Sequence, residues 1–275
     1  MGLIAPPNYI APPPIQGHRY GLYSVSMMRE TNERWELGVE WERLAGIRAA
    51  LRASECVDDY TADVDVRVGE ALDEGIPFFV TGSYSCKSAS RPIDEAEDRA
   101  RLHLQAGEER AIEFAISNPV VGNGPSFADA EDVTPTAGTA VPLVVALGLL
   151  ENAQYEQSGS VGAVHAPRFA GTLFSYDSLA FRQGQHMETA LGTHVAFGHY
   201  ANLDPDGSEA GEDEMWVYAT GMPTVRRGET FTQPDDTNYL NRDDNDVVIL
   251  AQRPVMVTWN GPTFGVLVDL TGYNS

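Results

Sequence analysis

The chain of 275 residues carries 40 Asp and Glu against 18 Lys and Arg, a formal charge of −22, and Lys87 is its single lysine. A surface this acidic repels nucleic acid and anionic membranes in dilute buffer, which argues against tight binding to either. Hydrophobic residues make up 43% of the chain, which is enough for a core. No stretch approaches the roughly 18 apolar residues of a membrane span, so we expect no membrane contact.

The charge also points to a habitat. At molar salt the Debye length falls to roughly 3 Å, and repulsion between acidic surfaces is largely screened. Acidic residues with arginine in place of lysine are therefore typical of a protein kept soluble in concentrated salt. The alternative is an acidic protein from a GC-rich bacterium, a background that also favours arginine over lysine.

The N-terminal third predicts an arm followed by β-strands. Five prolines and little periodicity over residues 1–19 favour an extended arm. Residues 20–27 and 35–41 alternate with a period of two, which predicts two strands joined by a turn. Residues 63–68 alternate in the same way, and 78–80 form a short apolar strand after a proline.

The clearest predicted helix covers residues 91–118. Ser90 can cap it, Pro92 suits its first turn, and Asn118 followed by proline ends it. A helix of this length spans roughly 36 Å and would cross a whole domain. One face carries mostly small residues, which would let a neighbouring element approach closely. The expected face consists of Ala96, Ala100, Leu104, Ala111, Phe114 and Ala115.

The remaining chain alternates between helices and strands. Residues 140–152 are almost wholly apolar, so we expect a fully buried helix there. A central strand over 161–165 and a helix over 167–181 follow. A further strand is expected over 192–200, and an acidic loop over 202–214 leads into another strand over 215–219. At the end of the chain, strands over 247–253 and 254–259 would pair with a last strand over 264–270.

The residue types of a catalytic triad are present without its motif. His165, Ser175 and Asp177 could supply base, nucleophile and acid, but no G-x-S-x-G elbow surrounds a serine. The chain also lacks a phosphate-binding loop motif and a dinucleotide-binding fingerprint. We therefore expect no catalytic residues and no cofactor.

Two groups of residues are candidate metal sites. His186, His194 and His199 are spaced by eight and five residues, which matches no known zinc pattern, so no metal is expected there. The acidic loop at 204–214 has some of the acid density of a calcium loop but lacks its twelve-residue register. A solvated loop is the expectation, with adventitious divalent binding as the alternative.

The cysteines and one arginine pair are structural candidates. Cys56 and Cys86 fit neither a zinc spacing nor a redox motif, so either two buried thiols or a disulfide closing the intervening loop is expected. Arg226 and Arg227 are the only adjacent basic pair. Nearby acids make the pair a poor nucleic-acid site and favour ion pairing between subunits.

The order of segments and four short phrases resemble the major capsid proteins of tailed viruses, those of the Hong Kong 97 type. RYGLYS at 19–24 and RWELGVEWERL at 34–44 are similar to the start of shell proteins from actinobacterial phages and haloarchaeal tailed viruses. YATGMPTVRRGE at 218–229 and LNRDDNDVVILAQRPVMVTW at 240–259 are similar to the end of the axial domain and the last peripheral strands.

The resemblance implies an α+β Hong Kong 97-like capsid fold in four parts. These are an N-terminal arm over residues 1–29, an extended loop region over 30–90, a peripheral domain over 91–139 and 247–275 with its spine helix over 91–118, and an axial domain over 140–246. In this fold the arm and the extended loop lie on neighbouring subunits. The single Lys87 argues against the lysine crosslinks of some members.

The implied function is structural. The chain would be a subunit of an icosahedral capsid that self-assembles into pentamers and hexamers and encloses double-stranded DNA without binding it specifically. It would reside in a virion assembled in the host cytoplasm, with decoration, scaffold and portal proteins as further partners. The alternatives are an encapsulin-like compartment shell or a minor vertex subunit of the same fold, and a salt-adapted α+β hydrolase.

Overall fold

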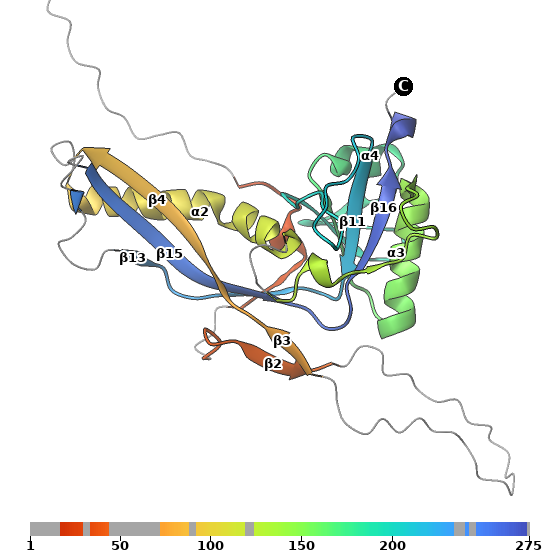
Figure 1. Cartoon of the computed structure of the whole chain (residues 1–275), viewed down its shortest axis with the longest axis horizontal. Coiled ribbons are helices and arrows are strands. Elements are labelled where there is room, and N and C mark those ends of the chain that lie inside the picture. Colours follow the sequence, from red (N-terminus) through yellow and green to blue (C-terminus); the bar gives the residue numbers. More distant parts are fainter. Residues whose placement is uncertain are drawn as a thin grey trace, which may run out of the picture.

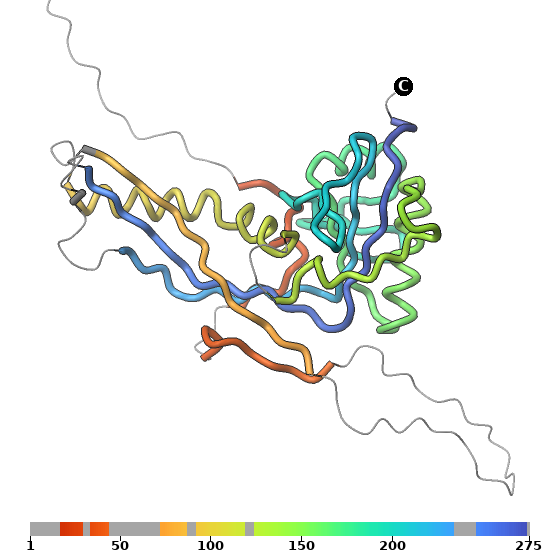
Figure 2. The backbone as a smooth tube through the Cα atoms, in the orientation of Figure 1, coloured from red at the N-terminus to blue at the C-terminus, as the bar shows by residue number. Residues whose placement is uncertain are grey.

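The computed structural model describes residues 17–29, 34–43, 72–87, 92–118, 124–233, 240–241 and 246–273. These residues form two parts (Figure 1). The elongated part consists of one long helix, α2 (Ile93–Ser117), on a six-stranded sheet. The compact unit consists of an eight-stranded sheet with two further helices. Figure 2 shows that α2 and the long strand β15 (Asp246–Thr258) run the length of the elongated part and end next to the compact unit.

Helix α2 confirms the long helix expected over 91–118. Its 25 residues span about 37 Å. Asp94 and Glu95 lie in its first turn, where they complement the positive end of the helix dipole. Pro92 is the residue before the helix, and the expected capping residue Ser90 lies outside the described residues.

The buried face of α2 differs from the predicted one. Ala111 and Phe114 are exposed, whereas Ile112 and Ile116 are fully buried. One stripe of buried positions repeats every four residues along the helix, and it includes an acidic residue, Glu108. A charged residue on the core face hid the correct phase of the helix from sequence analysis. The buried stripe runs through Ala96, Ala100, Leu104, Glu108, Ile112 and Ile116.

The six-stranded sheet is built around one long strand. β15 (Asp246–Thr258) pairs antiparallel with β4 (Phe78–Lys87), which extends the strand expected over 78–80. Its other edge pairs with shorter strands. These are β12 (Thr224–Arg227), β13 (Phe231–Gln233) and β14 (Leu240–Asn241), with β1 (Met27–Arg29) parallel to β12 at the sheet edge.

The expected break at Pro254 and pairing with the last strand are wrong. β15 runs through Pro254 as one strand of 13 residues. The Pro254 carbonyl accepts a hydrogen bond from Gly228 N, on the side where the sheet passes from β12 to β13. The missing N–H of proline therefore interrupts no ladder at that point. The last strand, β16 (Phe264–Asp269), lies in the other sheet against β11 (Glu214–Thr220).

The segment expected to be the first strand is partly helical. α1 (Leu22–Val25) is a single helical turn that buries Leu22 and Val25. The hydroxyl of Ser24 donates to the carbonyl of Gly21, which holds the turn. Residues 22–29 pack on the body through α1 and β1. Residues 1–16 lie outside the described chain, so the arm expected over 1–29 stays a prediction.

The next predicted strand is shorter than expected. β2 (Val39–Glu42) pairs antiparallel with β3 (Leu72–Gly75). Trp35 and Leu37 belong to the strand that the sequence predicts over 35–41, but they lie in a turn closed by a hydrogen bond from Gly38 N to the Trp35 carbonyl. Trp35 is buried and Leu37 is 96% exposed. The strand predicted over 63–68 lies outside the described residues.

The eight-stranded sheet forms the centre of the compact unit. β7 (Ala163–Pro167), expected over 161–165, is buried at every position between β10 (His194–Gly198) and β11. One edge continues through short strands, β9 (His186–Glu188) and β8 (Phe181–Gln183). The other edge carries β16 with β5 (Glu131–Asp132) and β6 (Val141–Pro142), and single 3-10 turns lie at Phe127–Asp129 and Thr271–Tyr273.

Helices α3 (Leu143–Ser158) and α4 (Ala170–Tyr176) pack on this sheet. The expectation that α3 is buried all round is wrong. Leu143 and Leu150 are buried, but Val144 and Val145 are exposed. The sheet covers only one side of α3, so its apolar outer side remains at the surface of the subunit.

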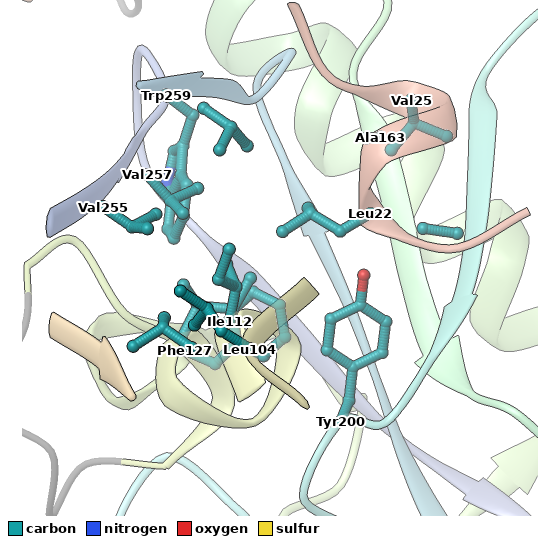
Figure 3. Packing of buried hydrophobic residues seen from close by; sticks show 14 of the residues in the cluster. Leu22, Val25, Leu104, Ile112, Phe127, Ala163, Tyr200, Val255, Val257 and Trp259 are labelled. Carbon is teal, nitrogen blue, oxygen red and sulfur yellow. The ribbon is translucent and has the colours of Figure 1, made fainter. Parts of the chain in front are cut away.

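Two hydrophobic clusters hold the parts together. One lies inside the compact unit, between its sheet and α3 and α4. The other joins the elongated part to the compact unit. Figure 3 shows Leu104 and Ile112 of α2 beside Val255 and Val257 of β15, with Tyr200 at the compact unit. Because this cluster is continuous across both sheets, the two parts form one body.

Candidate functional site

The three residue types of a catalytic triad, His165, Ser175 and Asp177, each have other partners in the structure. His165 is buried in β7, with Nδ1 3.1 Å from the Tyr200 hydroxyl and Nε2 2.9 Å from Thr220 Oγ1. Ser175 donates its hydroxyl to the Gly171 carbonyl, and Asp177 accepts from the Tyr273 hydroxyl. Since both ring nitrogens of His165 have partners in the core, this histidine cannot serve Ser175 as a base.

The hydrogen bonds around His165 assign its proton. Thr220 donates its hydroxyl to the Gly221 carbonyl, so it accepts from His165 Nε2–H, and Nδ1 accepts from Tyr200. Burial raises the pKa of Tyr200 well above its usual value, which keeps the phenol protonated as a donor. Burial lowers the pKa of His165 to about 3. The imidazole is therefore neutral and structural.

Among the described residues, buried carboxylates lie on α2. Glu108 is 3% exposed and binds two arginines. Its Oε2 lies 2.8 Å from Arg227 NH2 on β12, and its Oε1 lies 2.8 Å from Arg253 NH1 on β15. The Arg227 guanidinium also lies over the ring of Tyr23, 5.6 Å from its centroid. This triad ties α2 to two strands of the six-stranded sheet.

Arg227 was expected to pair between subunits, together with Arg226. Within the subunit, Arg227 binds Glu108, and Arg226 donates to Thr258 Oγ1 at 3.0 Å. Pairing of these arginines with a second subunit stays a prediction. Sequence reasoning missed Glu108 and Arg253, although a step of four residues from Leu104 along α2 would have placed Glu108 on the buried face.

Glu113 forms a second junction and is fully buried. Its Oε1 accepts from Leu22 N at 2.9 Å, and its Oε2 accepts from His199 N at 2.7 Å. A Cβ at Gly198 would lie 2.4 Å from the Glu113 carboxyl carbon, and one at Gly21 would lie 2.6 Å from its Oε1. The two glycines thus let backbone reach this carboxylate from both sides. Glu113 joins α2, the N-terminal segment and the compact unit.

Glu109 lies one helical turn before Glu113 on α2 and has a different environment. It accepts a hydrogen bond from Tyr23 N at 2.9 Å and lies 3.6 Å from His18 Nε2. Burial raises its pKa, and the backbone hydrogen bond from Tyr23 partly offsets that effect. The N-terminal segment is therefore held on α2 by two carboxylates one turn apart.

Three of the six histidines, His186, His194 and His199, formed a candidate metal group in the sequence, and they lie in two separate places. His199 lies on the junction, where its ring stacks on Phe114 with centroids 5.8 Å apart. His186 and His194 lie together, with ring centroids 4.8 Å apart. Glu188, which the sequence analysis did not single out, lies 2.8 Å from His186 Nε2 through its Oε1. The spacing of the histidines along the sequence does not predict this cluster, because its third member is a carboxylate.

The remaining candidates lie apart from these clusters. In the acidic loop, Asp204 Oδ1 accepts from Ser208 N at 2.7 Å, and within the described chain no three ligand groups of this loop converge. Cys86 is half-buried on β4, and Cys56 lies outside the described residues, so the disulfide stays a prediction. Among the described helices, none is long and apolar enough to span a bilayer.

Large apolar side chains are exposed on both parts of the molecule. Tyr176 on α4 is 80% exposed, and Leu191 in the β9–β10 turn is 74% exposed. On the elongated part, the exposed ring of Phe79 makes an edge contact with Phe231, with centroids 6.0 Å apart. Exposed apolar side chains on both parts of one body favour contacts with more than one neighbour.

The chain is similar to known proteins in its structure and not in its sequence. No protein-family model matches the chain, and no curated protein matches its sequence. A chain from Gordonia phage Cozz is 12% identical with a TM-score of 0.54, and the match covers 98% of this chain and 92% of that one. A chain from the capsid of a native GTA particle is 11% identical with a TM-score of 0.53, covering 97% and 96%.

A third match comes from the capsid of Ralstonia phage GP4. It is 12% identical with a TM-score of 0.51, and it covers 99% of this chain and 97% of that one. These likenesses run from end to end in both chains. They confirm that the chain has the α+β fold of phage capsid proteins, the Hong Kong 97-like fold expected from its sequence.

Proposed function

We propose that the chain is a structural subunit of an icosahedral virus capsid, not an enzyme. The observation that carries the proposal is the end-to-end likeness to chains of capsid structures. It is supported by exposed apolar side chains on both parts of the body, because a lone subunit would leave them in water. The partners of His165 support a non-catalytic role.

We assign the parts by their packing. The elongated part, with α2 as spine helix, is the peripheral domain. The compact unit is the axial domain, which meets its copies around the five- and six-fold axes, and β16 belongs to it instead of the peripheral domain. β2 and β3 form the described base of the extended loop region over 30–90. Residues of this loop and of the N-terminal arm contact neighbouring subunits in the assembled shell.

The shell encloses double-stranded DNA without binding it specifically. The formal charge of −22 favours confinement over binding, because the acidic surface repels phosphate. The particle is a virion assembled in the host cytoplasm, with decoration, scaffold and portal proteins as further partners. Genes for a portal, protease and terminase beside this one would separate a virus shell from an encapsulin-like compartment of the same fold.

Imaging the purified, untagged full-length protein in molar salt tests the proposal. We expect pentamers, hexamers or closed shells by electron microscopy and analytical ultracentrifugation. Tyr176→Ser and Leu191→Ser should each raise the protein concentration needed for assembly by about tenfold or more, since burying such a side chain contributes about 1.5–3 kcal/mol. Their melting temperatures should stay unchanged because both side chains are exposed.

The matched control is Thr172→Ser, which alters an exposed position one turn before Tyr176 on α4 and removes little apolar surface. It should assemble like the unaltered chain. A monodisperse monomer across protein concentrations and salt would contradict the proposed function.

A further inference from the structure

Strands β9 and β10 place two histidines and a glutamate on one face of the sheet. His186 and Glu188 are two positions apart on β9, so their side chains point to the same side. His194 on β10 is directly opposite Glu188 in the antiparallel register, so it points to that side too. The sheet register therefore fixes three metal-ligand side chains in one corner.

The distances are close to those of a metal site. The ligand atoms of His186, Glu188 and His194 lie within 4.8 Å of one another, and His186 Nε2 is 2.8 Å from Glu188 Oε1. In a tetrahedral zinc site with bonds of about 2.0–2.2 Å, ligand atoms are roughly 3.3 Å apart. All three side chains are half-buried. We expect side-chain rotations to close the remaining difference when an ion binds.

The bonding of His194 is incomplete. Its Nδ1 is buried and has no hydrogen-bond partner among the described residues. Buried polar atoms normally have a partner, and an unsatisfied one calls for a missing water or ion. This orphaned nitrogen belongs to the same imidazole that faces His186 and Glu188, which distinguishes the cluster from an ordinary surface ion pair.

We propose that His186, Glu188 and His194 bind one divalent transition-metal ion of the zinc class. Two imidazoles and one carboxylate suit Zn²⁺, whereas Ca²⁺ and Mg²⁺ prefer sites made of oxygen ligands. His186 also borders a cavity of about 580 Å³ together with Arg182 and Gln185. The cavity gives the ion an entry path and leaves room for water or a further ligand at an open fourth position.

Such an ion would clamp β9 to β10. Leu191, an exposed apolar side chain, lies in the turn between these strands. Metal binding would therefore hold in place a turn that faces outward from the compact unit. The proposal does not depend on the capsid function, because it rests on the ligand geometry of a single subunit.

The test is zinc binding to the untagged full-length protein after removal of metals with a chelator. ZnCl₂ is titrated against a chromophoric competitor in molar KCl, which suppresses loose binding of cations to the acidic surface. We expect one Zn²⁺ per chain that excess Ca²⁺ or Mg²⁺ does not displace. Co²⁺ in place of Zn²⁺ should give the strong visible absorption of tetrahedral coordination.

Variants separate the site from non-specific binding. His186→Ala should lower zinc affinity at least about 100-fold, more than the roughly 10- to 100-fold lost with an outer-shell partner. Glu188→Gln keeps the size of the side chain, removes its charge, and should also weaken binding. His103→Ala is the control, since His103 lies on α2 against the Ser83 carbonyl. Failure to bind Zn²⁺, or equal binding by all variants, would overturn the proposal.

Discussion

Two buried glutamates on α2 find their partners in different ways. Glu108 binds two arginines, whereas Glu113 accepts backbone N–H groups from two distant segments. Removing one partner from such a group leaves an uncompensated buried charge, which costs far more than an exposed pair contributes. These residues therefore constrain the body more tightly than the many surface acids.

His165 predicts a loss of stability on acidification. Its pKa is about 3 in the folded chain because of burial and 6.5 in the unfolded chain, so the unfolded chain binds the proton first. The stability from the neutral imidazole is complete above pH 6.5 and falls as the pH drops toward 3. Between pH 6.5 and 5 we expect a loss of about 2 kcal/mol from this residue.

The measurement is urea unfolding of the unaltered chain and of His165→Gln, in molar salt. The variant cannot titrate, so the stability advantage of the unaltered chain should shrink as the pH falls. The comparison also cancels Glu109, whose raised pKa acts in the opposite direction. Parallel pH curves for the two proteins would show that His165 does not contribute the effect.

At the scale of elements, the close approach of β4 to α2 depends on one glycine. A Cβ at Gly82 would lie 2.3 Å from Leu104 N and 2.7 Å from the Ala100 carbonyl oxygen. These are backbone atoms of a helix and cannot move aside. The sequence predicts that small residues on one face of the long helix let a neighbouring element approach closely. This prediction is confirmed at Ala100, where β4 packs directly on the helix backbone.

Two glycine substitutions should have opposite signs. Gly82→Ala should lower the free energy of unfolding by about 3 kcal/mol or more, through overpacking against α2. Gly107→Ala on α2 meets nothing within 4 Å and should raise it by about 0.5–1 kcal/mol, because alanine favours helix. Chemical denaturation measures both. Equal stability of the two variants would mean that the strand and helix can separate freely.

Local patterns predicted the elements better than their partners. The helix over 93–117, the buried strand over 163–167 and the acidic loop follow from periodicity and composition. The pairing of β16 did not, because a strand pattern does not specify which sheet receives it. Glu188 was missed for a similar reason: only strand register brings it to His186 and His194.

For the whole molecule, the formal charge of −22 sets the conditions for assembly. We expect shells to loosen below about 0.5 M salt, as the Debye length grows past roughly 4 Å and subunits repel. Light scattering during dilution, with a chelator present, would show the transition. Neutralising the exposed loop with Asp206→Asn and Glu212→Gln should move it to lower salt. Particles intact at low salt would contradict salt adaptation.

The layered structure of the elongated part also determines how it resists bending. It is a two-layer beam, with α2 lying on β4 and β15. When such a beam bends, its layers tend to slide past one another, and contacts between them resist the shear. The backbone contact at Gly82 and the ion triad at Glu108 are fixed points of this kind, set along the helix. A load on the outer end is therefore carried to the root of the beam, where the chain leaves α2 at Asn118 and β15 at Thr258.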